Sequence, residues 1–223
     1  AKGEFTAGAA LSDPLAQKTL RWLDFRRDET TAAFAEIAGF IAENPAWPGM
    51  AALRRQAERR IFDALPDAEA LNWFARYPSA SAEGGAAHAI ALFRSGKLAE
   101  ARTLAKTVWR ERDFVEGRDE TRFLNQFKDS LSADDHSARL DRLLWIEAFT
   151  PAQRLLPEVS ATTRILAEAR MSLARNEPGA DGIYARLAPA LRHDSGLMFE
   201  RLRWLRRKGQ DGEAEKLLAA PPK

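Results

Sequence analysis

The chain contains no cysteine, only three histidines and only two tyrosines among its 223 residues. The lack of cysteine excludes disulfide bonds and thiolate zinc sites, and it fits a cytoplasmic or a periplasmic protein equally well. No apolar run approaches the roughly 20 residues that cross a bilayer, and no secretory signal is recognisable at the start. We therefore expect no transmembrane segment and a protein that is soluble or has been processed.

An excess of charge of one sign is also lacking. The 34 Lys and Arg residues are nearly balanced by 32 Asp and Glu residues, which leaves a formal net charge of +2. A nucleic-acid-binding domain normally carries a dedicated basic face. A helical nucleic-acid binder is accordingly the least favoured class, and no nucleic-acid partner is expected.

Helix-forming residues are abundant. Hydrophobic residues make up 45% of the chain and charged residues 30%, alanine is frequent, and the β-favouring residues Val, Ile, Thr and Tyr are sparse. We expect an all-α fold, an irregular α-superhelix (solenoid) of about a dozen helices in antiparallel, tetratricopeptide-like hairpins. Residues 1–11 are expected to be disordered or to derive from an expression vector, and residues 12–220 to form a single α-superhelical domain.

The segment from Pro45 to Gly49 interrupts this helical pattern. Pro45 disfavours helical geometry at Asn44, so the preceding helix, capped by Thr30 or Thr31, should end there. Pro48 is expected in the first turn of the next helix, with Trp47 as an apolar residue at the corner. The helix that follows should place Met50, Leu53, Ala57 and Ile61 inward and Arg54, Arg55, Glu58, Arg59 and Arg60 outward.

Capping residues and apolar periodicity predict the remaining helices. The first begins at Ser12 or Asp13 with Pro14 in its first turn. The others are expected over residues 67–77, 88–94, 98–109, 119–131, 137–148, from Pro151, 160–174, 181–191, 196–208 and 213–219.

An internal repeat recurs at some of the helix–helix turns. In LFRSGKLAEARTL the spacing is Leu92, Gly96, Ala101 and Leu104, and LRRKGQDGEAEKL repeats it with Leu205, Gly209, Ala214 and Leu217. A weaker copy, LLWIEAFTPAQRL, begins at Leu143 and has Glu147 in place of the glycine. The glycine ends one helix, and the alanine lets the next helix approach closely, so each copy predicts a helical hairpin.

Most sequence patterns that could indicate a catalytic or ligand-binding site are incomplete or have a structural interpretation. The Gly96-Lys97 pair lacks the other residues of a phosphate-binding loop. His88, His136 and His193 are too far apart to suggest a metal site, and structural or surface roles are favoured. Asp134-Asp135 precedes a helix, where capping is the preferred interpretation. No catalytic, cofactor-binding or metal-binding residue is predicted, and no cofactor.

Two further sets of residues can be interpreted either as structural or as functional. The basic residues around Trp204 could bind an anionic polymer, but a solvated helix face is favoured; they are Arg201, Arg203, Arg206, Arg207 and Lys208. The six tryptophans could stack on sugars, but most recur at core spacing, so packing is the default; they are Trp22, Trp47, Trp73, Trp109, Trp145 and Trp204.

Several motifs in their order resemble a known family. They are FIAENPAWPGMAALRRQAE, then YPSASAEGGAAHAIALFRSGKLAEARTLAKTVWRE, then ARLDRLLW with AQRLLP. Together they are similar to the amino-terminal superhelical (U-shaped) domain of soluble lytic murein transglycosylases, from about Leu15 to Leu218. The resemblance implies a non-catalytic part of a periplasmic peptidoglycan lyase that cleaves glycan strands between MurNAc and GlcNAc and leaves 1,6-anhydro ends.

The catalytic residues of that family are not found in this chain. The family uses a glutamate followed by serine and a downstream Gly-Leu-Met-Gln motif, whereas this sequence has no Glu-Ser pair. Gly196-Leu197-Met198 is followed by Phe199 and is interpreted as coincidence. The resemblance therefore implies a scaffold that contacts peptidoglycan glycan strands through the full-length protein. The alternative is a stand-alone tetratricopeptide-like module that binds a protein partner in its concave groove. Pro221-Pro222-Lys223 is interpreted as a linker or a cut end, which favours the first hypothesis.

Overall fold

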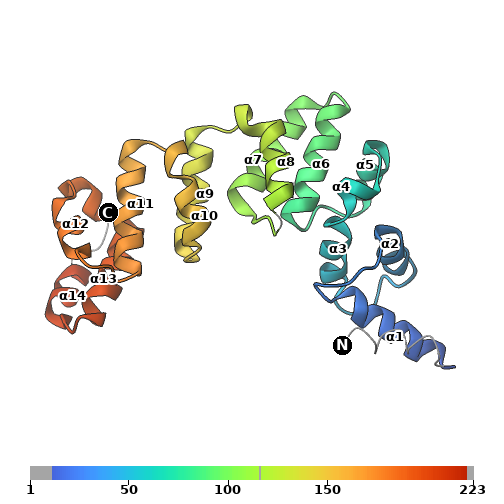
Figure 1. The fold of residues 1–223 in the computed structure, drawn as a ribbon, viewed down its shortest axis with the longest axis horizontal. Coiled ribbons are helices and arrows are strands. Elements are labelled where there is room, and N and C mark those ends of the chain that lie inside the picture. The colour runs from blue at the N-terminus through green and yellow to red at the C-terminus, as the bar shows by residue number, and fades with distance from the viewer. Residues whose placement is uncertain (1–11, 116, 220–223) are drawn as a thin grey trace. The chain divides into compact units, whose positions relative to one another are not determined.

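The protein is all-α and solenoid-like, as the composition predicts (Figure 1). The computed structural model describes residues 12–115 and 117–219. Fourteen α-helices and three short 3-10 turns, and no strand, are found in these two ranges. None of the helices described there is both long and apolar enough to cross a membrane. The expectations for residues 1–11 and for Pro221-Pro222-Lys223 lie outside the described residues.

The contacts group into two compact units that meet in sequence between Ser130 and Leu131. A single domain over residues 12–220 stays a prediction, and each unit is described by itself. The first unit contains α1 (Pro14–Phe25), α2 (Phe34–Glu43), α3 (Met50–Glu58), α4 (Ile61–Ala64), α5 (Asp67–Arg76), α6 (Ala82–Arg94), α7 (Leu98–Glu111), α8 (Gly117–Phe127) and a 3-10 turn (Lys128–Ser130).

Helix α6 is the central element of the first unit. It packs against α3, α4, α5, α7 and α8, and its small residues allow these close approaches. Gly85, for example, lies so close to Val108 of α7 that a side chain there would overlap it. Ala101 and Ala105 of α7 are fully buried. The side chains of α6 therefore link the amino-terminal hairpins of this unit to α7 and α8.

The second unit is built around α11. It contains α9 (Ala133–Trp145), α10 (Phe149–Arg154), a 3-10 turn (Leu156–Glu158), α11 (Ala161–Ala174), α12 (Ala180–Arg186), a 3-10 turn (Pro189–His193), α13 (Ser195–Arg207) and α14 (Asp211–Leu218). Helix α11 packs against α9, α12 and α13. Leu173, Leu197, Trp204 and Leu205 are buried at the centre of this unit.

At each repeated hairpin turn, the residue that ends the first helix has a left-handed backbone conformation. Gly96 and Gly209 have φ of 80° and 70°, and Glu147 adopts the same conformation with φ of 57°. In each turn the following amide donates to a carbonyl five residues back: Lys97 to Leu92 at 2.9 Å, Gln210 to Leu205 at 3.0 Å and Ala148 to Leu143 at 2.9 Å. These are the hydrogen bonds of a Schellman motif. The three copies are therefore confirmed as one local structure.

A fourth turn of this kind was not predicted. Asn176 has φ of 54°, and the Glu177 amide donates to the Ser172 carbonyl at 3.0 Å. Asparagine tolerates the left-handed region better than most residues, because its short polar side chain can bond locally. The sequence repeat does not extend to this turn, because Ser172, Asp181 and Tyr184 occupy the positions of its leucine, alanine and leucine.

The Pro45–Gly49 corner is confirmed as a helix end, but its details differ from the prediction. Helix α2 ends at Glu43 and Asn44 is its C-cap, whereas α3 begins only at Met50. Gly49 precedes α3 with φ of 75°, so Pro48 lies outside the helix and not in its first turn. The Pro48 carbonyl accepts a hydrogen bond from the Trp22 indole N–H at 2.8 Å, which ties the corner to α1.

Several predicted helix boundaries are also wrong. Ala33, not Thr30 or Thr31, is the N-cap of α2; the Thr30 hydroxyl donates to Asp24 at 3.1 Å and accepts from the Ala32 amide, which precedes the helix, at 3.3 Å. The helices expected over 119–131, 137–148 and 181–191 are α8, α9 and α12, which lie over 117–127, 133–145 and 180–186. After the first and last of these helices, separate 3-10 turns form over Lys128–Ser130 and Pro189–His193.

Candidate functional site

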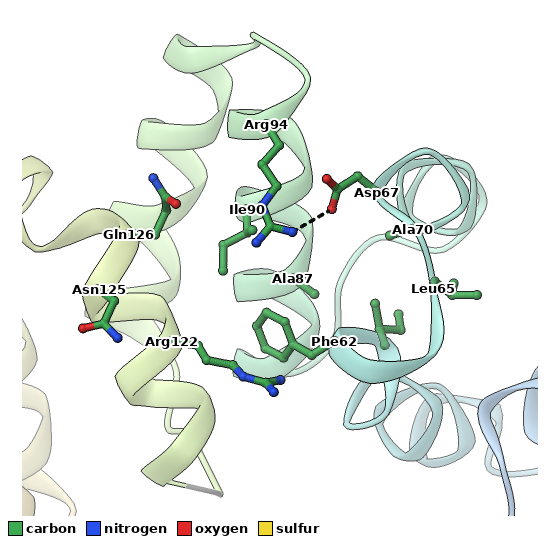
Figure 2. A pocket seen from close by; sticks show the side chains of 11 residues that line it. Phe62, Leu65, Asp67, Ala70, Ala87, Ile90, Arg94, Arg122, Asn125 and Gln126 are labelled. Carbon is green, nitrogen blue, oxygen red and sulfur yellow. Dashed lines mark hydrogen bonds and ion pairs between the residues drawn. The ribbon is translucent and has the colours of Figure 1, made fainter.

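The first unit contains a pocket of about 450 Å³ beside α6, here called the central pocket (Figure 2). Apolar side chains of α4, α5 and α6 contribute to its lining, and α8 contributes three polar side chains, Arg122, Asn125 and Gln126. The full lining is Ile61, Phe62, Leu65, Asp67, Ala70, Ala87, Ile90, Arg94, Arg122, Asn125 and Gln126. The pocket thus combines guanidinium and amide donors with apolar surface.

Two arginines of the central pocket are oriented by carboxylates. Figure 2 shows the Arg94 side chain reaching toward Asp67, with an N–O distance of 3.3 Å. Arg122 lies over the Phe62 ring, 5.4 Å from its centroid, and also donates to Asp63 at 2.9 Å. The Arg94 side chain is exposed, whereas Arg122 is half-buried and also lies 3.8 Å from the buried carboxylate of Asp119.

A second pocket in the same unit, here called the arginine pocket, has a volume of about 780 Å³. It is lined by Asp28, Thr31, Ala32, Ala33, Phe34, Gln56, Arg59, Arg60, Asp63, Ala64, Val115 and Arg118. Arg60 donates to the carbonyls of Thr30 at 2.7 Å and Gln56 at 2.6 Å, which holds the loop before α2 against α3. Arg59 pairs with Asp28 at 3.2 Å.

Sequence reasoning did not single out the residues of α8 that line these pockets. Arg118, Arg122 and Gln126 follow one another at intervals of four, so they share one face of α8, and this spacing is a signal that the sequence already contains. Periodicity could not reveal that this face lies opposite α4, because that placement depends on how both helices pack against α6.

Glu58 was expected to point to solvent, and that prediction is wrong. Its side chain is fully buried, because the carboxylate accepts hydrogen bonds from Ala80 and Ser81 at the start of α6. Burial raises the pKa of Glu58, while the hydrogen bonds from Ser81 and Ala80 and the charge of Arg112 act in the opposite direction. With its oxygens occupied and no access to solvent, this carboxylate has a structural role.

Each of the three histidines has different surroundings. His88 stacks on Phe74 with 4.6 Å between ring centroids, and burial lowers its pKa. His136 is buried in the first turns of α9, and burial lowers its pKa as well. His193 is exposed at the end of a 3-10 turn. Among the described residues, no group of three His, Cys, Asp or Glu side chains could hold a metal ion.

Of the Asp134-Asp135 pair only Asp135 helps to cap α9, and both residues lie in the first turn of the helix and not before it, so the capping prediction is confirmed for Asp135 alone. Ser132 is the N-cap, its hydroxyl accepts from the Asp135 amide at 3.3 Å, and the Asp135 carboxylate accepts from the Ser132 amide at 2.8 Å. This reciprocal arrangement is a capping box. It uses the carboxylate of Asp135 and leaves Asp134 exposed in the first turn.

The basic residues of α13 have mostly intramolecular partners. Arg201 pairs with Asp181 at 2.6 Å, Arg203 pairs with Glu147 at 2.6 Å, and Arg207 donates to the Ala174 carbonyl at 2.8 Å. These contacts pack α13 against neighbouring helices of the second unit. The set therefore does not form one free basic stripe for an anionic polymer. Arg206, Arg207 and Lys208 are exposed, as predicted for a solvated face, whereas Arg201 and Arg203 are half-buried.

Trp145 is the exception among the tryptophans. Trp73, Trp109 and Trp204 are buried in the cores, in agreement with the packing prediction. Trp145 is 45% exposed at the end of α9, where it contacts Phe199 with 5.3 Å between ring centroids. Phe199 and Ile146 are exposed as well, so the second unit presents a small apolar surface.

Gly196 has a packing role that accounts for a glycine at this position. A Cβ atom at Gly196 would overlap the Arg170 guanidinium, which lies against the start of α13. Leu197 is fully buried in the core of the second unit. The Gly196-Leu197-Met198 sequence is thus part of the start of α13, where these residues have packing roles.

Comparisons of the chain with protein-family models, with curated proteins and with solved structures give no match.

Proposed function

We propose that this chain is the non-catalytic helical arm of a periplasmic soluble lytic transglycosylase and that it holds peptidoglycan strands for cleavage between MurNAc and GlcNAc. The family assignment rests on the ordered motifs of the sequence. The observation that supports a binding role is the central pocket, where Arg94, Arg122, Asn125 and Gln126 offer hydrogen-bond donors beside apolar surface. Peptidoglycan carries hydroxyl, acetamido and carboxylate groups that such donors recognise.

Binding to insoluble peptidoglycan tests the proposed role of the chain. The purified 223-residue protein should co-sediment with peptidoglycan sacculi, and the double variant Arg122→Ala/Asn125→Ala should sediment less. Arg102→Ala is a matched control, because Arg102 is an exposed arginine on α7 that does not line the central pocket. Absence of co-sedimentation at physiological salt would contradict the proposal.

The coding sequence beyond Lys223 tests the enzyme assignment separately. A reading frame that continues into a Glu-Ser pair and a Gly-Leu-Met-Gln motif would support the proposed lytic transglycosylase. A stop codon directly after Lys223 would contradict it and would favour the protein-interaction module.

The second candidate, a module that binds a protein partner, is favoured by the exposed surface of Trp145, Ile146 and Phe199. Exposed aromatic side chains are enriched in protein–protein interfaces. The variant Trp145→Ser/Phe199→Ser distinguishes the two functions: it should leave sedimentation with peptidoglycan unchanged if the central pocket holds the polymer. Loss of sedimentation in this variant would place binding on the second unit instead.

A further inference from the structure

A third pocket of the first unit is lined by α2 and α5 and is here called the α2–α5 pocket. Its volume is about 410 Å³, which is within the roughly 300–1,000 Å³ range of small-molecule sites. Phe34, Ala38 and Ala42 of α2 line one side at intervals of four residues, so they share one face of that helix. Leu65 alone lines both this pocket and the central pocket, so the two can be altered separately.

Three aromatic side chains give the α2–α5 pocket much of its apolar lining. The Phe34 ring packs edge-on against the Trp73 ring with 5.1 Å between centroids, and the Trp73 ring contacts Tyr77 at 4.6 Å. Arg54, which does not line the pocket, lies over the Tyr77 ring at 4.8 Å. Trp73 is buried, whereas Phe34 and Tyr77 are half-buried, so the rings form a packed surface that is partly open to a ligand.

The polar side chains of this pocket are not used within the protein. Glu69, Asn72 and Arg76 are exposed on one face of α5. Tyr77 is the C-cap of the same helix. None of these four side chains makes a hydrogen bond or an ion pair with a residue that the structure describes. In contrast to the arginines of the central pocket, which pair with aspartates, they can bind a ligand without giving up an internal contact.

These four side chains match an uncharged ligand that is rich in hydroxyl groups. The Glu69 carboxylate only accepts hydrogen bonds, and the Arg76 guanidinium only donates them. Asn72 and Tyr77 do both. Since Glu69 and Arg76 are the charged residues of the lining, their charges balance, and neither an anion nor a cation is favoured. Sugar hydroxyls donate and accept, so a saccharide can use all four side chains while its C–H groups contact the aromatic rings.

The small residues of α2 leave room for a methyl group in the pocket. Ala38, Gly39 and Ala42 belong to its lining, and a Cβ atom at Gly39 would meet no neighbouring atom within 4 Å. An acetamido group presents a methyl group to such an apolar surface, and its amide can pair with the side-chain amide of Asn72. The lining is therefore more complementary to an N-acetylated sugar than to a sugar that carries only hydroxyl groups.

We infer that the α2–α5 pocket is a second binding site and that it takes an uncharged N-acetylated sugar. Glu69 and Arg76 bind hydroxyl groups of the sugar, and Asn72 binds its acetamido group. Phe34 and Tyr77 contact its C–H groups. The inference goes beyond the proposed function, because it concerns a different pocket and applies to a free oligosaccharide as well as to a polymer.

Titration of the full 223-residue chain with two uncharged trisaccharides tests the ligand class. Triacetylchitotriose, which has an acetamido group on each ring, should bind in ligand-observed NMR. Cellotriose, which has a hydroxyl group at the same position, should bind about tenfold more weakly. Added salt should leave the affinity for triacetylchitotriose unchanged, because this ligand carries no charge. Absence of triacetylchitotriose binding, or equal affinity for the two sugars, would overturn the inference.

A side chain placed inside the pocket tests its location. Gly39→Leu should reduce the affinity for triacetylchitotriose about tenfold or more, because the leucine occupies the open space beside α2. Gly212→Leu is the matched control, since Gly212 also lies in a helix with open space around it but does not line this pocket. Both variants should unfold at or above the melting temperature of the parent. Parent-like affinity of Gly39→Leu would refute the site.

A pair of double variants separates this pocket from the central pocket. Asn72→Ala/Arg76→Ala should reduce the affinity for triacetylchitotriose about tenfold or more, because it removes two of the free polar side chains. Arg122→Ala/Asn125→Ala removes the same two residue types from the central pocket and should leave this affinity unchanged. The reverse pattern would assign the sugar to the central pocket and overturn the inference.

Failure of this inference and failure of the proposed function give different results. A chain that co-sediments with peptidoglycan sacculi but does not bind triacetylchitotriose would refute the α2–α5 site and leave the proposed function standing. A chain that binds triacetylchitotriose at this pocket but does not co-sediment with sacculi would support the site and contradict the proposed function.

Discussion

Glu58, the last residue of α3, accepts two hydrogen bonds from Ser81, the N-cap of α6. The Ser81 hydroxyl donates at 2.6 Å and the Ser81 amide at 2.8 Å, and the Ala80 amide donates to the same carboxylate at 2.9 Å. Arg112, the C-cap of α7, donates to the Ser81 carbonyl at 2.8 Å. The helix N-terminus and these donors favour the charged carboxylate, but they only partly offset the cost of burying it. Glu58 therefore joins α3 to the helix that lines the central pocket.

Replacement of Glu58 by alanine should destabilise the protein by about 2–3 kcal/mol, because the amides of Ala80 and Ser81 lose a buried charged acceptor. The free energy of unfolding in urea, followed by circular dichroism, measures the loss. Glu43→Ala is the matched control, since Glu43 is exposed at the end of α2, and it should change the stability by less than about 0.5 kcal/mol. Equal effects of the two substitutions would contradict the structural role of Glu58.

Gly84 lies directly under the Glu58 carboxylate. A Cβ atom there would overlap the Glu58 side chain, so Gly84→Ala should destabilise the protein by about 1–3 kcal/mol. Gly39 is also inside a helix, but a Cβ atom there meets nothing, so Gly39→Ala should stabilise the protein by up to about 1 kcal/mol. Thermal unfolding of the two variants should give shifts of opposite sign, and a shift of the same sign would refute the close approach at Gly84.

The contribution of Glu58 should depend on pH. Burial raises its pKa in the folded protein above the ordinary value of 4.5, so the folded state favours the protonated carboxyl. The resulting stability is fully present below pH 4.5 and is lost as the pH rises through the raised pKa. The difference in unfolding free energy between the parent and Glu58→Gln should therefore favour the parent more at pH 4 than at pH 8. Glu200, whose pKa burial also raises, is common to both proteins and cancels in the difference. A difference that grows with pH would contradict this prediction.

Gly96 tests the left-handed turns of the repeat. Its φ is 80°, and a Cβ atom at this position meets no neighbour, so Gly96→Ala should destabilise the protein by about 1 kcal/mol through backbone strain alone. Gly212 of α14 likewise has open space around it but lies in a helix with negative φ, so Gly212→Ala should not destabilise the protein. Urea unfolding that shows no difference between these variants would contradict the role of the turn glycines.

Ala101 tests the close approach of the hairpin helices. It is fully buried at the contact of α7 with α6, so Ala101→Leu should overpack this contact and destabilise the protein by about 1–3 kcal/mol. Ala99 of the same helix is exposed, and Ala99→Leu should stay within about 0.5 kcal/mol of the parent. A parent-like melting temperature for Ala101→Leu would contradict the tight packing of the hairpin.

The sequence determined the features that depend on a few neighbouring residues. The all-α class, the left-handed turns at Gly96 and Gly209, and the capping of α9 by Ser132 and Asp135 follow from local backbone preferences and hydrogen bonds. The left-handed turn at Asn176 was not predicted, because only the folded chain shows that this asparagine takes the conformation usually reserved for glycine.

Only the tertiary structure decided the features that depend on distant parts of the chain. The periodicity of α3 places Glu58 on a polar face, yet its partner lies 23 residues away at Ser81, and no pattern within one helix can reveal that contact. Trp145 matches core spacing but lies where the second unit has no further layer to cover it, so it remains exposed. The ion pairs of Asp63 with the arginines of α8 likewise form because α4 and α8 both pack against α6, whereas the sequence specifies only the faces that these helices can present.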